Sequence, residues 1–320
     1  MFAEKEMPQL FADDIKKHPL EELGKGFYET QYGIAYLADS LELMKRIPDS
    51  SVDLVITSPP YALEFKKSYG NVNKNEYVDW FVEYAREIHR ILKDKGSFVV
   101  NIGGSYNKGT PTKSLYHFKL LIALVEEVGF FLAQEMFWYN PAKMPVPAEW
   151  VTVRRIRVKE SVEYVWWLSK TEWPNANNRN VLKEYSEDMK RLNAKGLDYQ
   201  DRPSGHNITP SFSSISAGGS IPSNVIEATN EAEDMLKFGN NSANDVYTKK
   251  CKANGVKPHP ARFPASLPEF YIKLLTNEGD VVLDPFAGSN TTGMVAERHK
   301  RFWISIDKME EYVKSSLYRF

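Results

Sequence analysis

The segment VVLDPFAGSNTTGMVAER, residues 281–298, carries the clearest signature of the fold. Its first three residues form a short apolar strand, a turn of small residues follows, and a helix begins near Thr291 or Thr292. In open α/β sheets, ligands bind beyond the carboxyl ends of the strands, where a small-residue turn lets them approach the backbone. The segment therefore predicts one unit of an α/β sheet with a ligand site at its turn.

The residues after this turn favour a ligand that contains a ribose. The next strand, FWISID, ends in Asp307, an acid placed to accept hydrogen bonds from ribose hydroxyls. The turn lacks the G-x-G-x-x-G pattern of nicotinamide dinucleotide sites, because Gly288 and Gly293 are five apart with Asn290 between them. It also lacks the G-x-x-x-x-G-K-[ST] pattern of P-loops. A glycine turn can also be purely structural, so these residues alone leave the function open.

Strand and helix patterns alternate along most of the chain. Residues 34–37 and 52–57 have strand character, and residues 41–47 between them have helical spacing. A second cycle comprises an amphipathic helix from residue 77, a Lys-Asp-Lys-Gly turn at 93–96 and a strand at 97–102. A helix at 118–128, a strand at 161–170 and the unit around residues 281–307 complete the pattern. This alternation predicts an α/β fold with a doubly wound, mostly parallel sheet.

Composition divides the chain into four parts. Residues 1–30 form a charged N-terminal leader, and residues 31–170 and 257–320 carry the α/β patterns. Residues 171–256 are rich in Asn, Ser, Gly and Lys, and they lack sustained periodicity. The composition of this part fits either a recognition module built from loops or a flexible insert.

The overall composition is that of a globular protein without membrane segments. The 320 residues are 42% hydrophobic, and 41 basic residues balance 42 acidic ones, so any contact with nucleic acid must come from a local basic surface. One cysteine cannot form an internal disulfide, the N-terminus lacks the apolar core of a signal peptide, and no run of about 18 apolar residues occurs. We therefore expect a cytoplasmic location.

A second motif, built around two consecutive prolines, occurs together with the glycine turn. In DLVITSPPYALEF, residues 53–65, a buried strand ends at two prolines flanked by Ser58 and Tyr61. TSPPY and DPFAGSNTTG together resemble the two signature motifs of the amino-group DNA methyltransferases, which use S-adenosyl-L-methionine. The order of the motifs resembles the permuted β group of this family. The resemblance covers most of residues 30–320 and implies a Rossmann-like methyltransferase fold, with residues 171–256 as the DNA target-recognition region.

The resemblance also implies a set of cofactor contacts. Asp39 is expected near the adenine, and the segment KPHPARFP precedes the cofactor strand. Two departures from the family pattern occur, because Asn290 replaces the usual second glycine of the turn and Ser305 stands where many members have glycine. The residues expected to bind the cofactor are Asp39, Phe263, Asp284, Phe286, Gly288, Ser289, Asn290, Thr291 and Asp307.

The proline motif has a chemical rationale. An exocyclic amine is a poor nucleophile because its lone pair is delocalised into the base. If the Ser58 hydroxyl and the Pro59 carbonyl accept hydrogen bonds from the amine, its lone pair can face the sulfonium methyl. Pro59 and Pro60 fix the backbone and remove competing donors, and Tyr61 supplies a face on which an extruded base can stack. Ser58, Pro59, Pro60 and Tyr61 are the predicted catalytic residues.

Several alternatives follow from the same residues. The serine before the prolines and segments such as RPSGH and GGSIP resemble those of the cytosine-N4 members of the family. Adenine-N6 methylation is the second hypothesis. A noncatalytic DNA-binding module and a methyltransferase of RNA or protein glutamine are less favoured, because both motifs are intact and the recognition region is large. Cys251 lacks the preceding proline of cytosine-C5 enzymes, and the histidines show no spacing typical of metal ligands.

The expected partner is double-stranded DNA containing a short target sequence. Arginines can read guanine edges, and lysines can hold phosphates. We predict DNA contacts for Arg154 and Arg155 in the basic stretch VRRIRVK, and for Arg202 in the recognition region. The enzyme would be the modification part of a restriction-modification system with a cognate endonuclease. The sequence leaves open whether the protein is a monomer or a homodimer.

Overall fold

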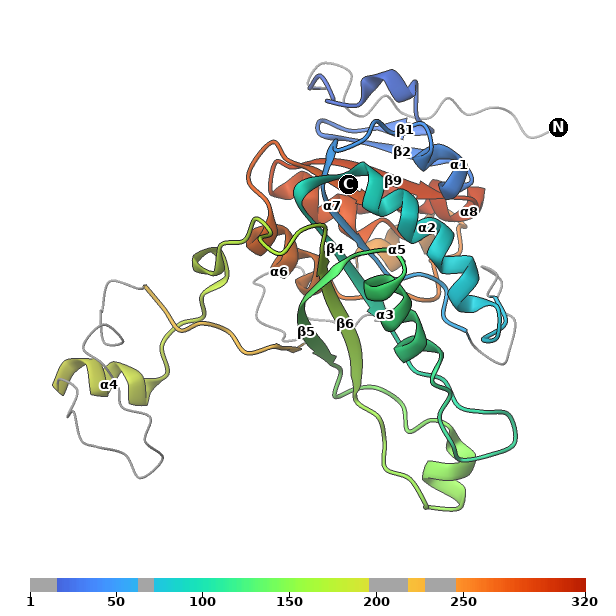
Figure 1. The fold of residues 1–320 in the computed structure, drawn as a ribbon, viewed down its shortest axis with the longest axis vertical. Coiled ribbons are helices and arrows are strands. Elements are labelled where there is room, and N and C mark those ends of the chain that lie inside the picture. Colours follow the sequence, from blue (N-terminus) through green and yellow to red (C-terminus); the bar gives the residue numbers. More distant parts are fainter. Residues whose placement is uncertain (1–15, 63–71, 196–217, 228–245) are drawn as a thin grey trace.

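The computed structural model describes residues 16–62, 72–195, 218–227 and 246–320. In these residues the strands form a nine-stranded sheet in the order β1-β2-β9-β8-β3-β4-β6-β5-β7 (Figure 1). The strands are β1 (Tyr28–Glu29), β2 (Gly33–Leu37), β3 (Val52–Thr57), β4 (Leu92–Ile102), β5 (Phe131–Tyr139), β6 (Val162–Ser169), β7 (Val225–Glu227), β8 (Val281–Asp284) and β9 (Phe302–Asp307).

Helices cover both faces of the sheet. The α-helices are α1 (Ser40–Met44), α2 (Tyr77–Ile91), α3 (Tyr116–Glu126), α4 (Glu187–Lys195), α5 (Val246–Ala253), α6 (Ser266–Leu275), α7 (Thr291–Arg298) and α8 (Glu310–Ser316). Short helical turns are η1 (Glu21–Leu23), η2 (Glu149–Val153), η3 (Asn178–Val181) and η6 (Leu317–Arg319). None of the helices in the described ranges is long and apolar enough to cross a membrane.

Two hydrophobic cores follow from the alternation of side chains along the central strands. Val55 of β3 packs in a cluster with residues of α1, α2 and α3. Its neighbours Leu54 and Ile56 point to the opposite face and join a second cluster with residues of α6, α7 and α8. Because successive side chains of a strand alternate between faces, a strand covered on both sides must be apolar throughout. The sheet is doubly wound, as the sequence predicts.

The sheet is mostly parallel with antiparallel strands toward its edges. Neighbouring strands pair in parallel from β2 through β9, β8 and β3 to β4. β6 runs antiparallel to both β4 and β5, and β1 runs antiparallel to β2. The carboxyl ends of the central parallel strands therefore meet at one edge, which is where the two sequence motifs lie.

One predicted turn is wrong. The Lys-Asp-Lys-Gly stretch belongs to β4, which begins directly after α2. The register between β3 and β4 shifts there, because Val52 pairs with Leu92 whereas Leu54 pairs with Ser97. The Lys93 ammonium lies 2.8 Å from the Asp53 carboxylate of β3, and this ion pair holds the irregular stretch against the sheet.

Parts of the predicted leader and recognition region pack on the α/β unit. Leu20 and Leu23 are buried and β1 pairs with β2, so the fold begins before residue 31. β7 extends the sheet beside β5. In α5, the Tyr247 hydroxyl lies 3.0 Å from Ser315 Oγ of α8, so this helix joins the C-terminal half. α4 stands apart from the sheet (Figure 1).

Candidate active site

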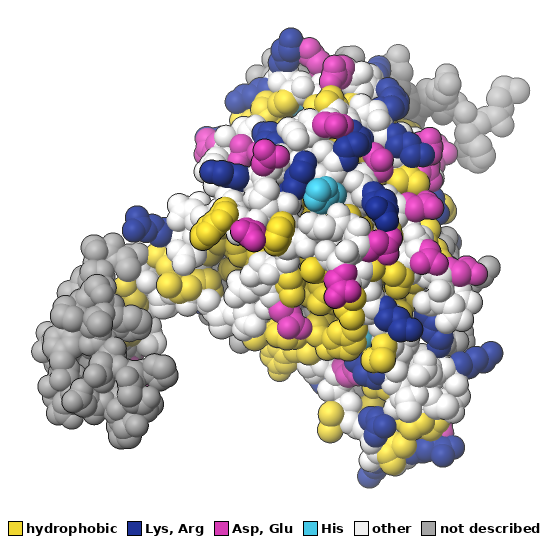
Figure 2. All heavy atoms as spheres, viewed as in Figure 1, with side chains coloured by type: hydrophobic (Ala, Val, Ile, Leu, Met, Phe, Trp, Pro, Cys, Tyr) yellow, Lys and Arg dark blue, Asp and Glu magenta, His cyan; other side chains and the backbone are white. Residues whose placement is uncertain are grey.

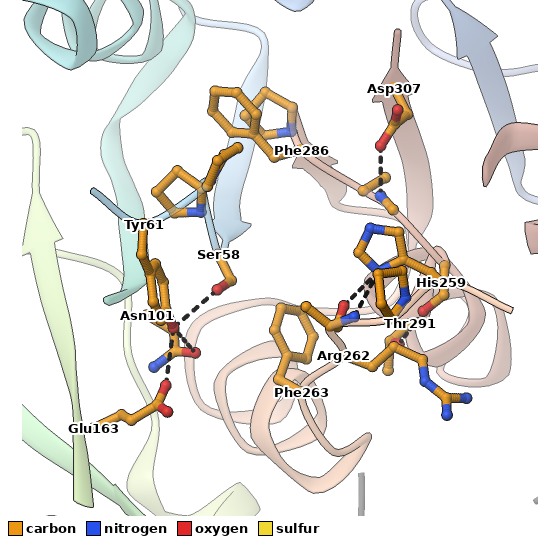
Figure 3. A pocket seen from close by; sticks show the side chains of 18 of the residues that line it. Ser58, Tyr61, Asn101, Glu163, His259, Arg262, Phe263, Phe286, Thr291 and Asp307 are labelled. Atoms are coloured by element: carbon orange, nitrogen blue, oxygen red, sulfur yellow. Dashed lines mark hydrogen bonds between the residues drawn. The ribbon is translucent and has the colours of Figure 1, made fainter. Parts of the chain in front are cut away.

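A cavity of about 820 Å³ lies at the carboxyl edge of the sheet. Its lining includes residues that follow β2, β3 and β8, the ends of β4 and β9, residues of α2, β5 and β6, and the segment 259–263 before α6. In Figure 3 the proline motif stands on one side of the cavity, and Asp307, His259 and Thr291 stand on the other. Carboxyl ends of parallel strands form a ligand crevice of this kind.

The proline-motif wall comprises Ser58, Pro59, Pro60, Tyr61, Asn101 and Glu163. The Tyr61 hydroxyl is its centre (Figure 3): it accepts a hydrogen bond from Ser58 Oγ at 3.2 Å and lies 3.1 Å from Asn101 Oδ1 and 2.9 Å from Glu163 Oε2. Burial, followed by the Glu163 charge, raises the pKa of Tyr61 well above its usual value. The phenol therefore stays neutral and keeps its hydrogen.

The Tyr61 ring has a fixed position as well as a fixed hydroxyl. It lies over Gly103, which follows β4, and a Cβ atom at Gly103 would stand 2.6 Å from Tyr61 Cε2. No side chain can occupy that space unless the ring moves. Glycine at this position is therefore required by the close approach of the ring.

The opposite side, the glycine-turn wall, comprises Gly288, Ser289, Thr291, Asp307 and His259. Asp307 accepts hydrogen bonds from the backbone N–H groups of Gly288 at 3.0 Å and Met309 at 2.8 Å. Burial raises the pKa of Asp307. Gly288 has a φ of +51°, and a Cβ atom there would stand 3.1 Å from the His259 ring. Both the backbone conformation and the space therefore favour glycine at 288.

Asp284 lies behind the cavity and joins the two motifs. Its carboxylate accepts hydrogen bonds from Thr57 Oγ1 at 2.7 Å, Thr292 Oγ1 at 2.7 Å and Phe286 N at 3.1 Å. Only 2% of Asp284 is exposed, and burial raises its pKa to about 6 although these bonds oppose the shift. Asp284 does not line the cavity, so its placement supports a positioning role in place of the expected direct contact.

Asn290 also supports the turn from behind, and its conformation explains the departure from glycine. It adopts a left-handed conformation with φ 54° and ψ 45°, which glycine and asparagine tolerate best. Its side chain accepts a hydrogen bond from Gly293 N at 3.0 Å and donates one to the Tyr28 hydroxyl at 3.0 Å. Asn290 therefore caps α7 and lies outside the cavity lining.

The other predicted residues divide between the cavity and the surface. Asp39 lines the cavity and also caps α1, because its carboxylate accepts a hydrogen bond from Leu41 N at 3.0 Å. Cys251 is buried and does not line the cavity. The predicted residues that line it together are Asp39, Ser58, Pro59, Pro60, Tyr61, Phe263, Phe286, Gly288, Ser289, Thr291 and Asp307.

The predicted DNA-contacting arginines are not part of the cavity. Arg154 and Arg155 are exposed just after η2, and Arg154 Nε lies 2.6 Å from Glu149 Oε1. Figure 2 shows Lys and Arg side chains mixed with hydrophobic ones at this end of the molecule, where Val153 and Val158 are exposed. Arg202 lies outside the described residues. A DNA contact for each of these arginines stays a prediction.

Sequence reasoning missed the polar side chains that complete the proline-motif wall. Asn101 interrupts the apolar run SFVVNIGG, and Glu163 interrupts the aromatic strand SVEYVWWLSK. A polar residue in such a run is the signal that points to a site, because burial of an unpaired polar group is costly. No such sequence signal points to Lys143, whose ammonium lies 2.9 Å from Glu163 Oε1. No group of three or more His, Cys, Asp or Glu among the described residues could hold a metal ion.

The fold and the site together define a Rossmann-like α/β enzyme with a ligand cavity between two motif-bearing walls. The family model described as DNA methylase matches residues 52–317, and the chain belongs to this family. This membership confirms the family resemblance seen in the two motifs.

Individual relatives agree with this assignment. The type II methyltransferase M.PvuII of Proteus hauseri is 50% identical over 299 residues, which are 92% of this chain and 86% of that protein. A solved structure described as PvuII DNA methyltransferase (cytosine-N4-specific) has a TM-score of 0.73 and 44% identity, covering 92% of this chain and 89% of that chain. A putative DNA modification methylase of Thermus thermophilus, solved in complex with S-adenosyl-L-methionine, has a TM-score of 0.52 and 19% identity, covering 89% of this chain and 92% of that chain. The last likeness concerns the fold alone.

Proposed function

We propose that the chain is a site-specific DNA methyltransferase that transfers a methyl group from S-adenosyl-L-methionine to the exocyclic N4 of cytosine in double-stranded DNA. The observation that carries the proposal is that the proline motif and the glycine turn face each other across one cavity. The Thr57–Asp284 hydrogen bond joins the strands that end in these motifs. The M.PvuII relative at 50% identity and the cytosine-N4-specific structure support the choice of cytosine.

The residues of the glycine-turn wall fit S-adenosyl-L-methionine. Asp307 lines the cavity, its two oxygens accept backbone hydrogen bonds, and a carboxylate has about four acceptor positions, so positions remain for ribose hydroxyls. Phe263 and Phe286 line the same cavity and offer aromatic faces to an adenine ring. Gly288 lines the cavity without a side chain, so a ligand can approach the backbone there. When bound, the cofactor supplies an electrophilic methyl group on a sulfonium.

The proline-motif wall fits the nucleophile. The Ser58 hydroxyl and the Pro59 carbonyl accept hydrogen bonds from the target amine and turn its lone pair toward the cofactor side of the cavity. The Tyr61 ring, held at its hydroxyl and over Gly103, offers a surface for the extruded base. The amine reaches this wall only when the base leaves the duplex, because base pairing otherwise occupies it.

A nucleoside assay tests the function. The purified chain is incubated with methyl-labelled S-adenosyl-L-methionine and unmethylated mixed-sequence duplex DNA, and the DNA is digested to nucleosides. We expect N4-methylcytosine, whereas N6-methyladenine alone would support adenine methylation instead. Ser58→Ala should lower the methyl-transfer rate by roughly 10²-fold or more, because one preorganised hydrogen-bonding group is lost. Full activity of Ser58→Ala would contradict this role of Ser58.

Binding of the cofactor separates an enzyme from a noncatalytic DNA-binding module. Calorimetry with S-adenosylhomocysteine should show binding to the purified chain, and a chain that binds DNA alone would favour the module. Comparing duplex DNA with RNA of the same sequence tests the substrate class. We further propose that the enzyme works in the cytoplasm beside a cognate endonuclease, and sedimentation would distinguish the monomer from the homodimer.

A further inference from the structure

A chain of hydrogen bonds runs from the cavity into the wall behind the proline motif. Ser58 Oγ donates to the Tyr61 hydroxyl at 3.2 Å, and the Tyr61 hydroxyl lies 2.9 Å from Glu163 Oε2. The other Glu163 oxygen accepts from Lys143 Nζ at 2.9 Å, and only 15% of the Glu163 side chain is exposed. Glu163 and Lys143 come from segments that are far from Ser58 and Tyr61 in the sequence, so the tertiary fold brings these hydrogen bonds together.

The direction in which hydrogens are donated along these bonds is determined at Glu163, the end farthest from Ser58. A carboxylate accepts hydrogen bonds and donates none, whereas a hydroxyl has one hydrogen to donate. Tyr61 also lies 3.1 Å from Asn101 Oδ1, and the Asn101 amide nitrogen donates to the Tyr164 carbonyl, so that oxygen is the group turned toward Tyr61. Between the two acceptors, the charged one at the shorter distance takes the Tyr61 hydrogen.

The direction of donation also determines how the Ser58 hydroxyl is oriented toward the cavity. If Tyr61 gives its hydrogen to Glu163, its oxygen is free to accept the Ser58 hydrogen. Ser58 then turns lone pairs, and no hydrogen, toward the cavity. A target amine needs an acceptor at this place, and a Ser58 hydroxyl that pointed its hydrogen into the cavity would oppose it.

We propose that Glu163 is a positioning residue that sets the direction of the Ser58–Tyr61 chain, so that Ser58 faces the target amine as an acceptor. Lys143 assists by holding the Glu163 carboxylate in place. The inference rests on the proposed methyltransferase function and adds to it a residue outside both sequence motifs. Glu163 touches neither the substrate amine nor the cofactor in this role, because it acts through Tyr61.

The proposal makes an unusual prediction about two substitutions. In Glu163→Gln, the Lys143 ammonium needs an acceptor and draws the amide oxygen, so the amide nitrogen faces Tyr61 as a donor. Tyr61 can then donate only to Asn101 Oδ1, and the amide N–H competes with the Ser58 hydroxyl for the Tyr61 oxygen. The displaced Ser58 hydrogen points into the cavity. In Glu163→Ala, Tyr61 can still donate to Asn101 Oδ1, and the direction is kept. The isosteric glutamine should therefore be more harmful than alanine.

The expected effects differ enough to be measured. We expect Glu163→Gln to lower the single-turnover methylation rate on the order of 10²-fold, as when one preorganised hydrogen-bonding group is lost. Glu163→Ala should lower it by only about tenfold, the effect of one charged hydrogen bond. Replacing Lys143 by Met in the Glu163→Gln protein frees the amide to turn its oxygen toward Tyr61. This double variant should recover most of the loss, relative to Lys143→Met alone.

A second glutamate of the protein, Glu160, provides a matched control. Glu160 accepts a hydrogen bond from the Tyr106 hydroxyl at 2.9 Å and pairs with Lys113 at 3.0 Å, the same pattern outside the cavity lining. Glu160→Gln should leave the rate unchanged. All proteins are compared with labelled S-adenosyl-L-methionine and unmethylated plasmid DNA under single-turnover conditions, and calorimetry with S-adenosylhomocysteine checks that the cofactor site is intact.

The outcomes separate this inference from the function on which it rests. A wild-type protein that transfers no methyl group would contradict the function itself. An active wild type in which glutamine is no worse than alanine would overturn the role of Glu163. The same holds if Lys143→Met fails to rescue Glu163→Gln while both proteins remain folded and bind S-adenosylhomocysteine. A loss caused only by misfolding would lower cofactor binding in parallel with the rate.

Discussion

The two walls of the cavity are built in different ways. The glycine-turn wall is fixed largely by bonds to backbone groups, since Asp307 accepts from Gly288 N and Met309 N, and Asn290 caps α7. The proline-motif wall is fixed by bonds between the side chains of Ser58, Tyr61, Asn101 and Glu163. Backbone groups are present whatever the residue, whereas side-chain networks depend on each member. The first wall should tolerate single changes that the second does not.

Asp284 links the glycine-turn wall to the proline-motif wall. It belongs to the segment that leads into the glycine turn, and it accepts a hydrogen bond from Thr57, the residue before Ser58. The ends of β3 and β8 are therefore held together directly behind the cavity. A change at this link should affect both walls moderately, whereas a change within one wall should affect one property strongly.

Gly103→Ala should give the largest effect, on the proline-motif wall alone. Its Cβ atom would stand 2.6 Å from the Tyr61 ring, whose hydroxyl is also held, so the ring must leave its position. Misplacement by about 1 Å near a reacting group can cost on the order of 10²-fold in rate. We expect a loss of this size in single-turnover methylation, with unchanged affinity for S-adenosylhomocysteine by calorimetry.

The neighbouring glycine supplies the control for this change. A Cβ atom at Gly104 would meet the end of the flexible Lys113 side chain, at 3.0 Å from its nitrogen, and that side chain can move aside. Gly104→Ala should retain most of the rate. Equal losses in both variants would mean that the backbone after β4, and not the position of the Tyr61 ring, controls the activity.

Gly288→Ala should have a smaller effect on the other wall. Alanine in the left-handed conformation costs roughly 1–2 kcal/mol, and its methyl group would stand 3.1 Å from the His259 ring at the cavity lining. We expect about tenfold weaker binding of S-adenosylhomocysteine, measured by calorimetry, with a nearly unchanged methylation rate at saturating cofactor.

A second glycine, Gly279, serves to separate the effect of backbone strain from an effect on the cavity. Gly279 also has a positive φ, +85°, and a Cβ atom there meets nothing within 4 Å. Gly279→Ala should lose similar stability in urea denaturation but keep its affinity for the cofactor. If both variants bind S-adenosylhomocysteine equally weakly, global strain accounts for the result and the glycine-turn wall does not.

The same contrast explains what the sequence could predict. The glycine turn and the start of α7 at Thr291 are local features, because Asn290 caps the helix within its own segment. The pattern predicts β3 at residues 52–57 because a strand covered on both faces must be continuously apolar. The predicted turn at 93–96 is wrong because its local composition is typical of turns, whereas pairing with β3 keeps the chain in the sheet.

The missed residues are those whose meaning depends on distant partners. Glu163 contacts Tyr61 across about a hundred positions of sequence, and Lys143 reaches Glu163 from the segment after β5. Asp284 could be predicted as important from its motif, but not that it lies behind the cavity with Thr57 as its partner. Local patterns identify motifs, whereas the packing of strands decides which side chains meet.

Thr57→Val tests the link between the walls and should have the smallest effect. Valine keeps the shape but removes a donor to the buried Asp284 carboxylate, which should cost about 1–3 kcal/mol of the free energy of unfolding at neutral pH. The pKa of Asp284 is about 6 in the folded protein against an ordinary value of 3.8. The folded state therefore holds this proton more tightly, so the stability from Asp284 is fully present below 3.8 and is lost as the pH rises through about 6.

Loss of the Thr57 bond raises the pKa of Asp284 further, because that bond lowers it. The difference in stability between wild type and Thr57→Val should therefore grow as the pH rises through about 6 in urea denaturation. Asp307, whose pKa burial also raises, is present in both proteins and cancels in this difference. In an Asp284→Asn background the substitution should lose its pH dependence. A difference that stays constant with pH would show that the bond does not act through the Asp284 charge, and the two walls would then be joined only by the pairing of β3 with β8.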